Sequence, residues 1–531
     1  MSGRARHRPP NRKKGRCVLS IVVPCLILIA TASGCKSPHS LRWGDFAKDE
    51  RVVPARAQAT PIQATGLPSP SILPAEREYP VDLDTSLRLA EAENPQIAEA
   101  RQRVGEALAL QQGADALLLP SLNIGTSFHS HTGNLQRSGG TILNLDQKSL
   151  YFGGGAGPVA AGSVPIPAIN IYSQLTDAIF EPLATRQQVE NSRFSATATA
   201  NSILLDVARL HFELLAAEAE LQARRESAVQ EAEVVRLTRA YADAQQGREA
   251  DAERAATELS LVQIEIQHAE EGVAVASARL ARRLHLDQSV RLRPLSPVLQ
   301  AVTIVDPHVP LPDLIETAIR RRPEVAARAF AIAAATTRQK EEKYRPLLPT
   351  LWLGFSGGGF GGGSNLVGPE LAHFGGRTDL DVMAFWTLRN LGAGNLSIIK
   401  RRAAEVGQAV GEQSRVINEI QSEVSSAYAD VIAARQQIEI TTRQLKSANS
   451  GFREDLERIR NTVGRPLEAV NSLQLLNQAR VAHIRAVTDY DKAEFGLFVA
   501  LGSPPPLEGS AIVPISSAPV ALPPLPPLVG R

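Results

Sequence analysis

The sequence predicts a mainly α-helical fold, in which long antiparallel helical hairpins carry a small β part. Three observations predict it: an internal repeat over most of the chain, apolar residues spaced as in a coiled coil, and four short stretches in which apolar and polar residues alternate. The composition agrees, because aromatic residues make up only 5% of the 531 residues, too few for large aromatic cores. With 57 Lys and Arg against 55 Asp and Glu, the charge gives no reason to expect a nucleic-acid partner.

The start of the chain has the pattern of a signal peptide. A basic segment precedes an apolar run over residues 17–32, which is short, and is interrupted by Pro24, for a membrane-spanning helix of about 20 residues. The run ends in Ala-Ser-Gly-Cys at Cys35, which resembles the site where bacterial lipoproteins are cleaved and acylated. We expect removal of residues 1–34 and lipidation of Cys35. Ordinary cleavage beside a chance cysteine is the alternative.

Two proline-rich segments without periodicity flank the repeat. Residues 35–80 are expected to be an N-terminal linker, and residues 503–531 a disordered tail. Between them, residues 205–286 align without a gap with residues 422–503. We therefore predict two repeats, over residues 81–300 and 301–502.

Each repeat is expected to begin with a helix that leads into a strand. Asn94-Pro95 opens the first helix, which ends before Leu119-Pro120. Arg322-Pro323 opens the second, which ends before Leu348-Pro349. Proline suits the first turn of a helix and restricts the residue before it, so both signals mark helix boundaries.

The longest predicted helices follow the strands. Residues 187–244 contain no proline or glycine, and a helix of that length extends for about 85 Å. Apolar residues alternate at spacings of four and three, which is a heptad seam. The seam residues are Ile203, Val207, Leu210, Leu214, Ala217 and Leu221, and in the second repeat Ile420, Val424, Ala427, Val431, Ala434 and Ile438. Acidic residues along the helices, Glu231, Glu233, Asp251 and Glu253, are expected to form a solvated face.

Each long helix is expected to turn back on itself at a glycine. Gly247 ends the first, and Gly464 with Pro466 after it ends the second. Glycine is expected to take the left-handed position there, and proline to start the returning helix. The alternative is that these glycines merely break helices within a bundle.

Four stretches with a period of two predict four strands. They are Leu122 to His129, Ile169 to Ile179, Leu351 to Phe355 and Leu380 to Leu388. A closed barrel needs about eight strands, and an open sheet edge is excluded from lipid, so four transmembrane strands must be shared between subunits. Three chains would form a twelve-stranded barrel. Two β-hairpins packed on the helices of a soluble protein are the alternative.

Two glycine-rich segments are expected to be loops of the β part, at residues 153–162 and 356–376. No helix and no Lys-Ser or Lys-Thr pair follows the glycines near Gly357, so a phosphate-binding loop is not expected. His129 and His131 alternate onto one strand face without carboxylate or cysteine partners, so no metal site is expected.

Taken together, these features resemble the TolC-like outer-membrane efflux family. The resemblance rests on Asn94-Pro95, on the Leu-Pro-Ser-Leu exit at Leu119, on the duplication and on the hairpin turn at Val463-Gly464-Arg465, and it covers residues 81 to 502. It implies a homotrimer with one barrel in the outer membrane and a periplasmic helical tunnel. The protein would then be a passive conduit in a tripartite efflux or secretion system.

In this family the hairpin tips contact a periplasmic adaptor protein, which couples the channel to an inner-membrane pump. The resemblance assigns this contact to Gly247, Arg248, Val463, Gly464 and Arg465. The first tip lacks the valine and reads Gln246-Gly247-Arg248, so the resemblance is weaker there.

Two other function classes are open to the sequence. One is a structural coiled-coil envelope lipoprotein without a channel. The other is a hydrolytic envelope enzyme, which is disfavoured because no nucleophile elbow, zinc-ligand helix or carboxylate pair stands out. No enzymatic activity, cofactor or metal is expected.

Overall fold

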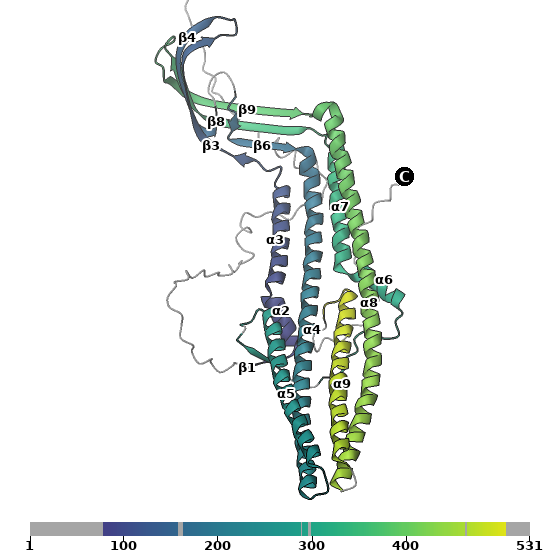
Figure 1. The fold of residues 1–531 in the computed structure, drawn as a ribbon. Helices are drawn as coiled ribbons and strands as arrows, with labels where there is room; N and C mark the ends of the chain where they lie inside the picture. Colours follow the sequence, from purple (N-terminus) through teal and green to yellow (C-terminus); the bar gives the residue numbers. More distant parts are fainter. Residues whose placement is uncertain (1–77, 158–162, 288, 296–298, 462–464, 506–531) are drawn as a thin grey trace, which may run out of the picture. The chain divides into compact units, whose positions relative to one another are not determined.

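The fold is described from a computed structural model, in which residues 78–157, 163–287, 289–295, 299–461 and 465–505 are described (Figure 1). These residues belong to one compact unit. The predicted signal peptide, Cys35, Val463, Gly464 and nearly all of the predicted tail lie outside the described residues.

The first repeat opens with a short strand and two helices. Strand β1 (Glu78–Val81) begins within the predicted linker and pairs in parallel with β7 (Arg291–Pro294). Helices α2 (Leu83–Glu93) and α3 (Pro95–Asp115) follow. The Asn94 side chain caps α3 by accepting from the Gln96 backbone N–H at 2.9 Å, which satisfies one of the free donors of the first turn.

The long helices pair into two hairpins of almost equal length. Helix α4 (Leu175–Asp243) has 69 residues and α8 (Ala393–Arg460) has 68, and the returning helices α5 (Glu249–Arg283) and α9 (Pro466–Ala500) have 35 each. The first hairpin therefore starts earlier than predicted and includes Pro182 inside α4. Its length corresponds to about 100 Å between the sheet and the turn.

Helices α6 (Leu311–Arg321) and α7 (Pro323–Tyr344) open the second repeat as α2 and α3 open the first. A short 3-10 helix, η2 (Arg389–Gly392), joins the sheet to α8.

Helix α4 lies at the centre of the helical layer. It packs against α3 and α7 near the sheet and against α5 and α9 farther along, while α8 packs against α7 and α9 (Figure 1). Phe194 of α4 stacks on Phe330 of α7, and Phe212 meets Phe495 of α9 edge to face. The seams are buried at Ile203, Val207, Leu214, Leu221, Ile420, Val424, Val431 and Ala434.

The larger sheet has seven described strands: six of them form four rows, and the seventh, β5, pairs with the end of β4. The strands are β2 (Ser121–Leu122), β3 (Ile124–Gln136), β4 (Ile142–Ala156), β5 (Ile166–Pro167), β6 (Ile169–Gln174), β8 (Thr350–Ser364) and β9 (Ala372–Phe385). Strands β6 and β4 lie end to end along one edge of β8, and β9 follows its other edge. Strands β2 and β3 form the outer row beside β6 and β4.

The sheet differs from the sequence-based prediction in four segments. Residues 142–156 form β4, although no strand was expected there and residues 153–156 were assigned to a loop. The glycines after Phe355 continue β8 to Ser364. The second predicted strand ends at Gln174, because Leu175 begins α4, and the fourth ends at Phe385.

Strand β8 accommodates many glycines because aromatic rings from neighbouring residues occupy the space where larger side chains would lie. A Cβ atom on Gly359 would lie 2.5 Å from the ring of Phe152, and one on Gly361 would lie 2.4 Å from the ring of Phe374. Glycine at these positions therefore lets the rings approach the backbone closely.

None of the helices in the described part of the chain is both long and apolar enough to cross a lipid bilayer.

Candidate functional site

The first hairpin turn is closed by backbone bonds to the last turn of α4. The N–H groups of Gln246 and Gly247 both donate to the carbonyl oxygen of Tyr241 at 3.0 Å. Gln245 takes the left-handed conformation, with φ of 59°, and Gly247 does not. The expectation of a left-handed Gly247 is therefore wrong. Glycine fits there because a Cβ atom would approach the Cβ atom of Tyr241 to 3.1 Å.

Of the predicted tip residues, three are described. Gly247 is half-buried in the first turn, and Arg248 and Arg465 are exposed at the starts of α5 and α9. Arg248 and Arg465 each occupy the residue before the returning helix, and Pro466 takes its first position as predicted. Val463 and Gly464 lie outside the described residues.

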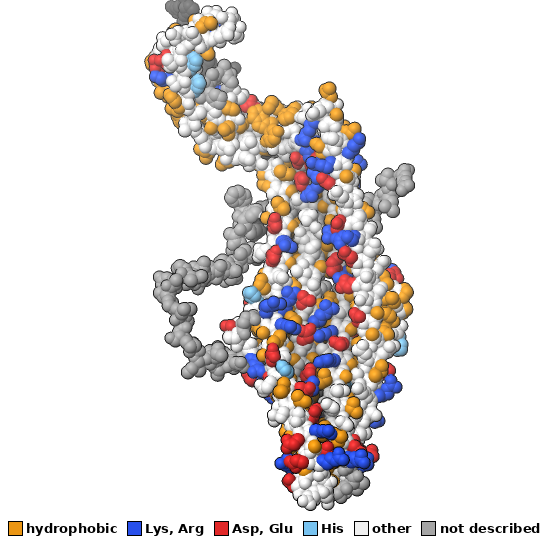
Figure 2. All heavy atoms as spheres, viewed as in Figure 1, with side chains coloured by type: hydrophobic (Ala, Val, Ile, Leu, Met, Phe, Trp, Pro, Cys, Tyr) orange, Lys and Arg blue, Asp and Glu red, His pale blue; other side chains and the backbone are white. Residues whose placement is uncertain are grey.

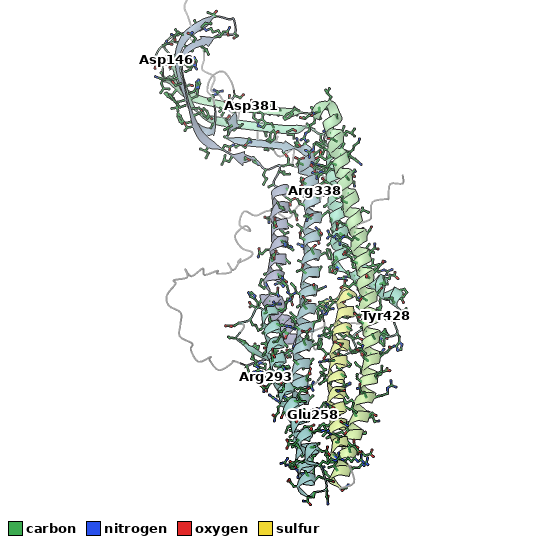
Figure 3. The ribbon with its side chains drawn as sticks, in the orientation of Figure 1. Asp146, Glu258, Arg293, Arg338, Asp381 and Tyr428 are labelled. Carbon is green, nitrogen blue, oxygen red and sulfur yellow. The ribbon has the colours of Figure 1, made fainter. Side chains whose placement is uncertain are left out.

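The two hairpins are tied together close to their turns. The Tyr241 hydroxyl of α4 donates to the Ile459 carbonyl oxygen of α8 at 2.6 Å. Arg460 donates to Glu233 at 3.2 Å. Glu258 of α5, labelled in Figure 3, accepts from Gln474 at 3.0 Å. The two turns therefore lie side by side at one end of the helices.

Charged side chains of both signs surround the turns (Figure 2). Arg239 of α4 pairs with Glu249 at 2.7 Å and Glu253 at 3.1 Å, both on α5. These exposed pairs contribute little stability each, so they fix local geometry rather than hold the hairpin together.

One acidic residue near the turns is buried, contrary to the expectation of a solvated face. Glu231 is 1% exposed, and its Oε1 atom has no hydrogen-bond partner among the described residues. Burial, and next the charge of Glu258, raise the pKa of Glu231 to about 7. The signal was present in the sequence, since Glu231 continues the seven-residue spacing of the seam that includes Ile203 and Leu210.

A second buried charge cluster lies where the sheet joins the helices. Arg345, after α7, pairs with Asp177 of α4 at 2.7 Å and with Glu341 and Glu342 of α7 at 2.5 and 2.8 Å. Burial is the largest cause that raises the pKa of Glu341 to about 8, and the charge of Glu181 adds to it. No sequence motif marked this cluster, because its members come from separate repeats.

The sheet has one apolar and one polar face. In an antiparallel sheet, paired residues lie on the same face. Ile169 pairs with Phe355, and Phe355 pairs with Leu380, so their side chains share one face. Hydrophobic side chains of this face are exposed on all four rows: Leu122, Ile124, Phe128, Phe152, Ile169, Phe355, Leu380 and Val382.

The opposite face carries polar and charged groups. Ser127, His129 and His131 of β3 lie on it, as do Arg377, Asp379 and Asp381 of β9. Among the residues that the structure describes, no group of three or more His, Cys, Asp or Glu side chains is placed to hold a metal ion.

Solved structures of outer-membrane channels share this fold. The outer membrane protein VceC of Vibrio cholerae matches with a TM-score of 0.62 and 13% identity, over 79% of this chain and 96% of that one. The CmeC outer membrane channel of Campylobacter jejuni matches with a TM-score of 0.59 and 13% identity, over 79% and 85%. CusC, whose structures concern transmembrane channel formation, matches with a TM-score of 0.58 and 18% identity, over 83% and 99%.

No family model and no curated protein sequence matches the chain. The structural matches confirm the predicted fold, which is mainly helical with long helices and a small antiparallel sheet, as in TolC-like channels.

Proposed function

We propose that this chain is one subunit of an outer-membrane channel, and that it serves an efflux or secretion system as a passive conduit. The observation that carries the proposal is a four-row sheet with an exposed apolar face, joined to long helices of about 100 Å. Such a sheet suits lipid on one side and water on the other. The helices then extend the conduit across the periplasm.

The free edges of the sheet support assembly into a trimer. Within the described chain, β9 pairs only with β8, and β3 pairs only with β4. Unpaired N–H and C=O groups are excluded from hydrocarbon, so each edge needs a strand from another subunit. Three copies of four rows give a closed barrel of twelve, wide enough to contain a lumen.

The hairpin turns are the proposed contact for a periplasmic adaptor protein, which would couple the channel to an inner-membrane pump. This role falls to Gly247, Arg248, Val463, Gly464 and Arg465. The exposed Arg248 and Arg465 each precede a returning helix, and two neighbouring turns offer paired positions for a helical partner.

We further propose that Cys35 is acylated after removal of residues 1–34, which would add a lipid anchor in the outer membrane. The Ala-Ser-Gly-Cys sequence supports this assignment. Metabolic labelling with radioactive palmitate should mark the wild-type protein and not the Cys35→Ser variant. Labelling of both would contradict it.

Paired substitutions on neighbouring residues test the channel itself. Val382 lies on the apolar face and is 71% exposed, and Met383 lies on the opposite face and is 50% exposed. Val382→Arg should prevent assembly in the outer membrane, because arginine at the lipid face costs about 2–4 kcal/mol per subunit. Met383→Arg should assemble normally.

The assembled wild type should appear in cryo-electron microscopy as a threefold particle with a continuous lumen. Equal assembly of both arginine variants, or a solid helical rod, would instead support a structural coiled-coil lipoprotein that links envelope layers.

A further inference from the structure

A small hydrophobic cluster lies on the polar face of the sheet. Val164, in the connection between β4 and β5, is 1% exposed and packs against Tyr151 of β4 and Phe360 of β8. Tyr151 is also 1% exposed, and it pairs with Phe360 in the sheet. An apolar side chain is therefore held against the face that carries Ser127, Arg377 and Asp379.

Polar contacts hold both ends of the same connection on this face. The Ser163 hydroxyl donates to Oδ1 of Asp381 on β9 at 2.8 Å. The Ser127 hydroxyl of β3 donates to the carbonyl oxygen of Gly157. Ser127 pairs with Tyr151, so these contacts belong to one side of the sheet.

The connection returns to the sheet along the same side. A Cβ atom on Gly354 of β8 would lie 2.6 Å from Cγ of Pro167, so the proline ring occupies the space over that glycine. Gly354 pairs with Asp381, the residue that accepts from Ser163. Residues 163–167, of which the last two are β5 and pair with Gly155 and Ala156 at the end of β4, thus lie across β8 on the polar face, opposite the exposed apolar band.

We propose that residues 163–167 form a ledge inside the barrel that narrows the lumen and limits the size of the solutes that pass. This inference rests on the proposed function, in which the polar face lines the lumen and three copies surround it. The ledge is fastened to three rows of the sheet, by Val164 against β4 and β8 and by Ser163 against β9. Pore width and lining charge decide which solutes a channel conducts.

The charges beside the ledge give it a polar rim. Asp381 has one carboxylate oxygen, Oδ2, that is buried without a partner among the described residues. Arg377 pairs with Asp379 at 2.9 Å and lies over the ring of Phe360, at 5.4 Å from its centroid. The narrow part of the lumen therefore combines apolar bulk from the ledge with an arginine and two aspartates per subunit.

Cysteine modification of purified trimers in planar bilayers tests the ledge. In Ser163→Cys channels, a cationic methanethiosulfonate should lower the single-channel conductance in up to three steps, one for each subunit. Phe128→Cys is the control, because Phe128 is 60% exposed on the apolar face. The same reagent should leave its conductance unchanged. Unchanged conductance in Ser163→Cys channels whose modification is confirmed by mass spectrometry would overturn the ledge.

A second variant tests the ledge without labelling. Val164→Asp should raise the single-channel conductance, because a carboxylate does not stay between Tyr151 and Phe360, whereas Val164→Ile should leave it near that of the wild type. Equal conductance of Val164→Asp and wild type would also overturn the ledge while the channel assignment stands. No conductance from wild-type trimers would overturn the proposed function, and the ledge with it.

Discussion

Tyr241 at the end of α4 donates its hydroxyl hydrogen to the carbonyl oxygen of Ile459 at the end of α8, across 2.6 Å. The bond joins two residues that belong to different repeats, close to both hairpin turns. It is a direct link by which one hairpin restrains the other.

Tyr241→Phe should loosen the turns without unfolding the helices. One hydrogen bond contributes about 1 kcal/mol, which is small for hairpins of this length. We expect faster hydrogen–deuterium exchange in residues 236–247, measured by mass spectrometry, and unchanged exchange near the sheet. Tyr172→Phe, in β6, serves as the control. Unaltered exchange at the turn would mean that the hydroxyl does not restrain it.

Glycine should stabilise the first turn at position 245, an effect that the expectation of a left-handed Gly247 does not predict. Gln245→Gly should stabilise the hairpin by up to about 1 kcal/mol, because Gln245 has a φ of 59°. Gly247→Ala should destabilise it, since its Cβ atom would crowd Tyr241. Thermal unfolding followed by circular dichroism separates the two variants. The reverse order would contradict the assigned turn.

Stability should depend on the protonation of Glu231. Its pKa is about 7 in the folded protein and about 4.5 when unfolded, so the folded state binds the proton more tightly. This group's contribution is fully present below pH 4.5 and is lost as pH rises to 7, by about 3 kcal/mol.

Glu231→Gln should therefore be more stable than wild type at pH 8 and similar to it at pH 4.5. Melting temperatures at both values provide the measurement, and Glu253→Gln, on an exposed glutamate, is the matched control. A pH dependence that persists unchanged in Glu231→Gln would show that other groups cause it.

Arg345→Met should be among the most destabilising changes near the sheet. It leaves Glu341 and Glu342, which are buried, and Asp177 without their shared cation, at a cost of about 3–5 kcal/mol. We expect a lower yield of assembled protein and a lower dissociation temperature in detergent. Arg338→Met, within α7, controls for the loss of an arginine in general. Equal behaviour of both variants would argue against the cluster.

Much of the helical architecture could be predicted because its determinants are local. Asn94-Pro95 and Arg322-Pro323 begin α3 and α7, and the seam from Ile203 to Leu221 is largely buried as its spacing indicates. Proline geometry and heptad spacing act within a few residues, so each can be read without knowledge of the partner.

The sheet was harder to predict because some of the contacts that stabilise it join residues far apart in the sequence. Glycine has no side chain, so the alternation that identifies a strand is invisible from Gly357 to Gly363. The strand forms there because the rings of Phe152 and Phe374 come from other strands to cover it. The Arg345 cluster likewise joins α4 to α7 and has no local pattern.

The matched lengths of the two hairpins restrict how the protein can change in size. Both returning helices have 35 residues, and Tyr241–Ile459 and Glu233–Arg460 contacts hold their turns at the same level. Seven residues added to each helix of one hairpin alone would move its turn by about 10 Å and separate these partners. An insertion that lengthens the molecule is therefore tolerated only when a second insertion of the same length accompanies it in the other repeat.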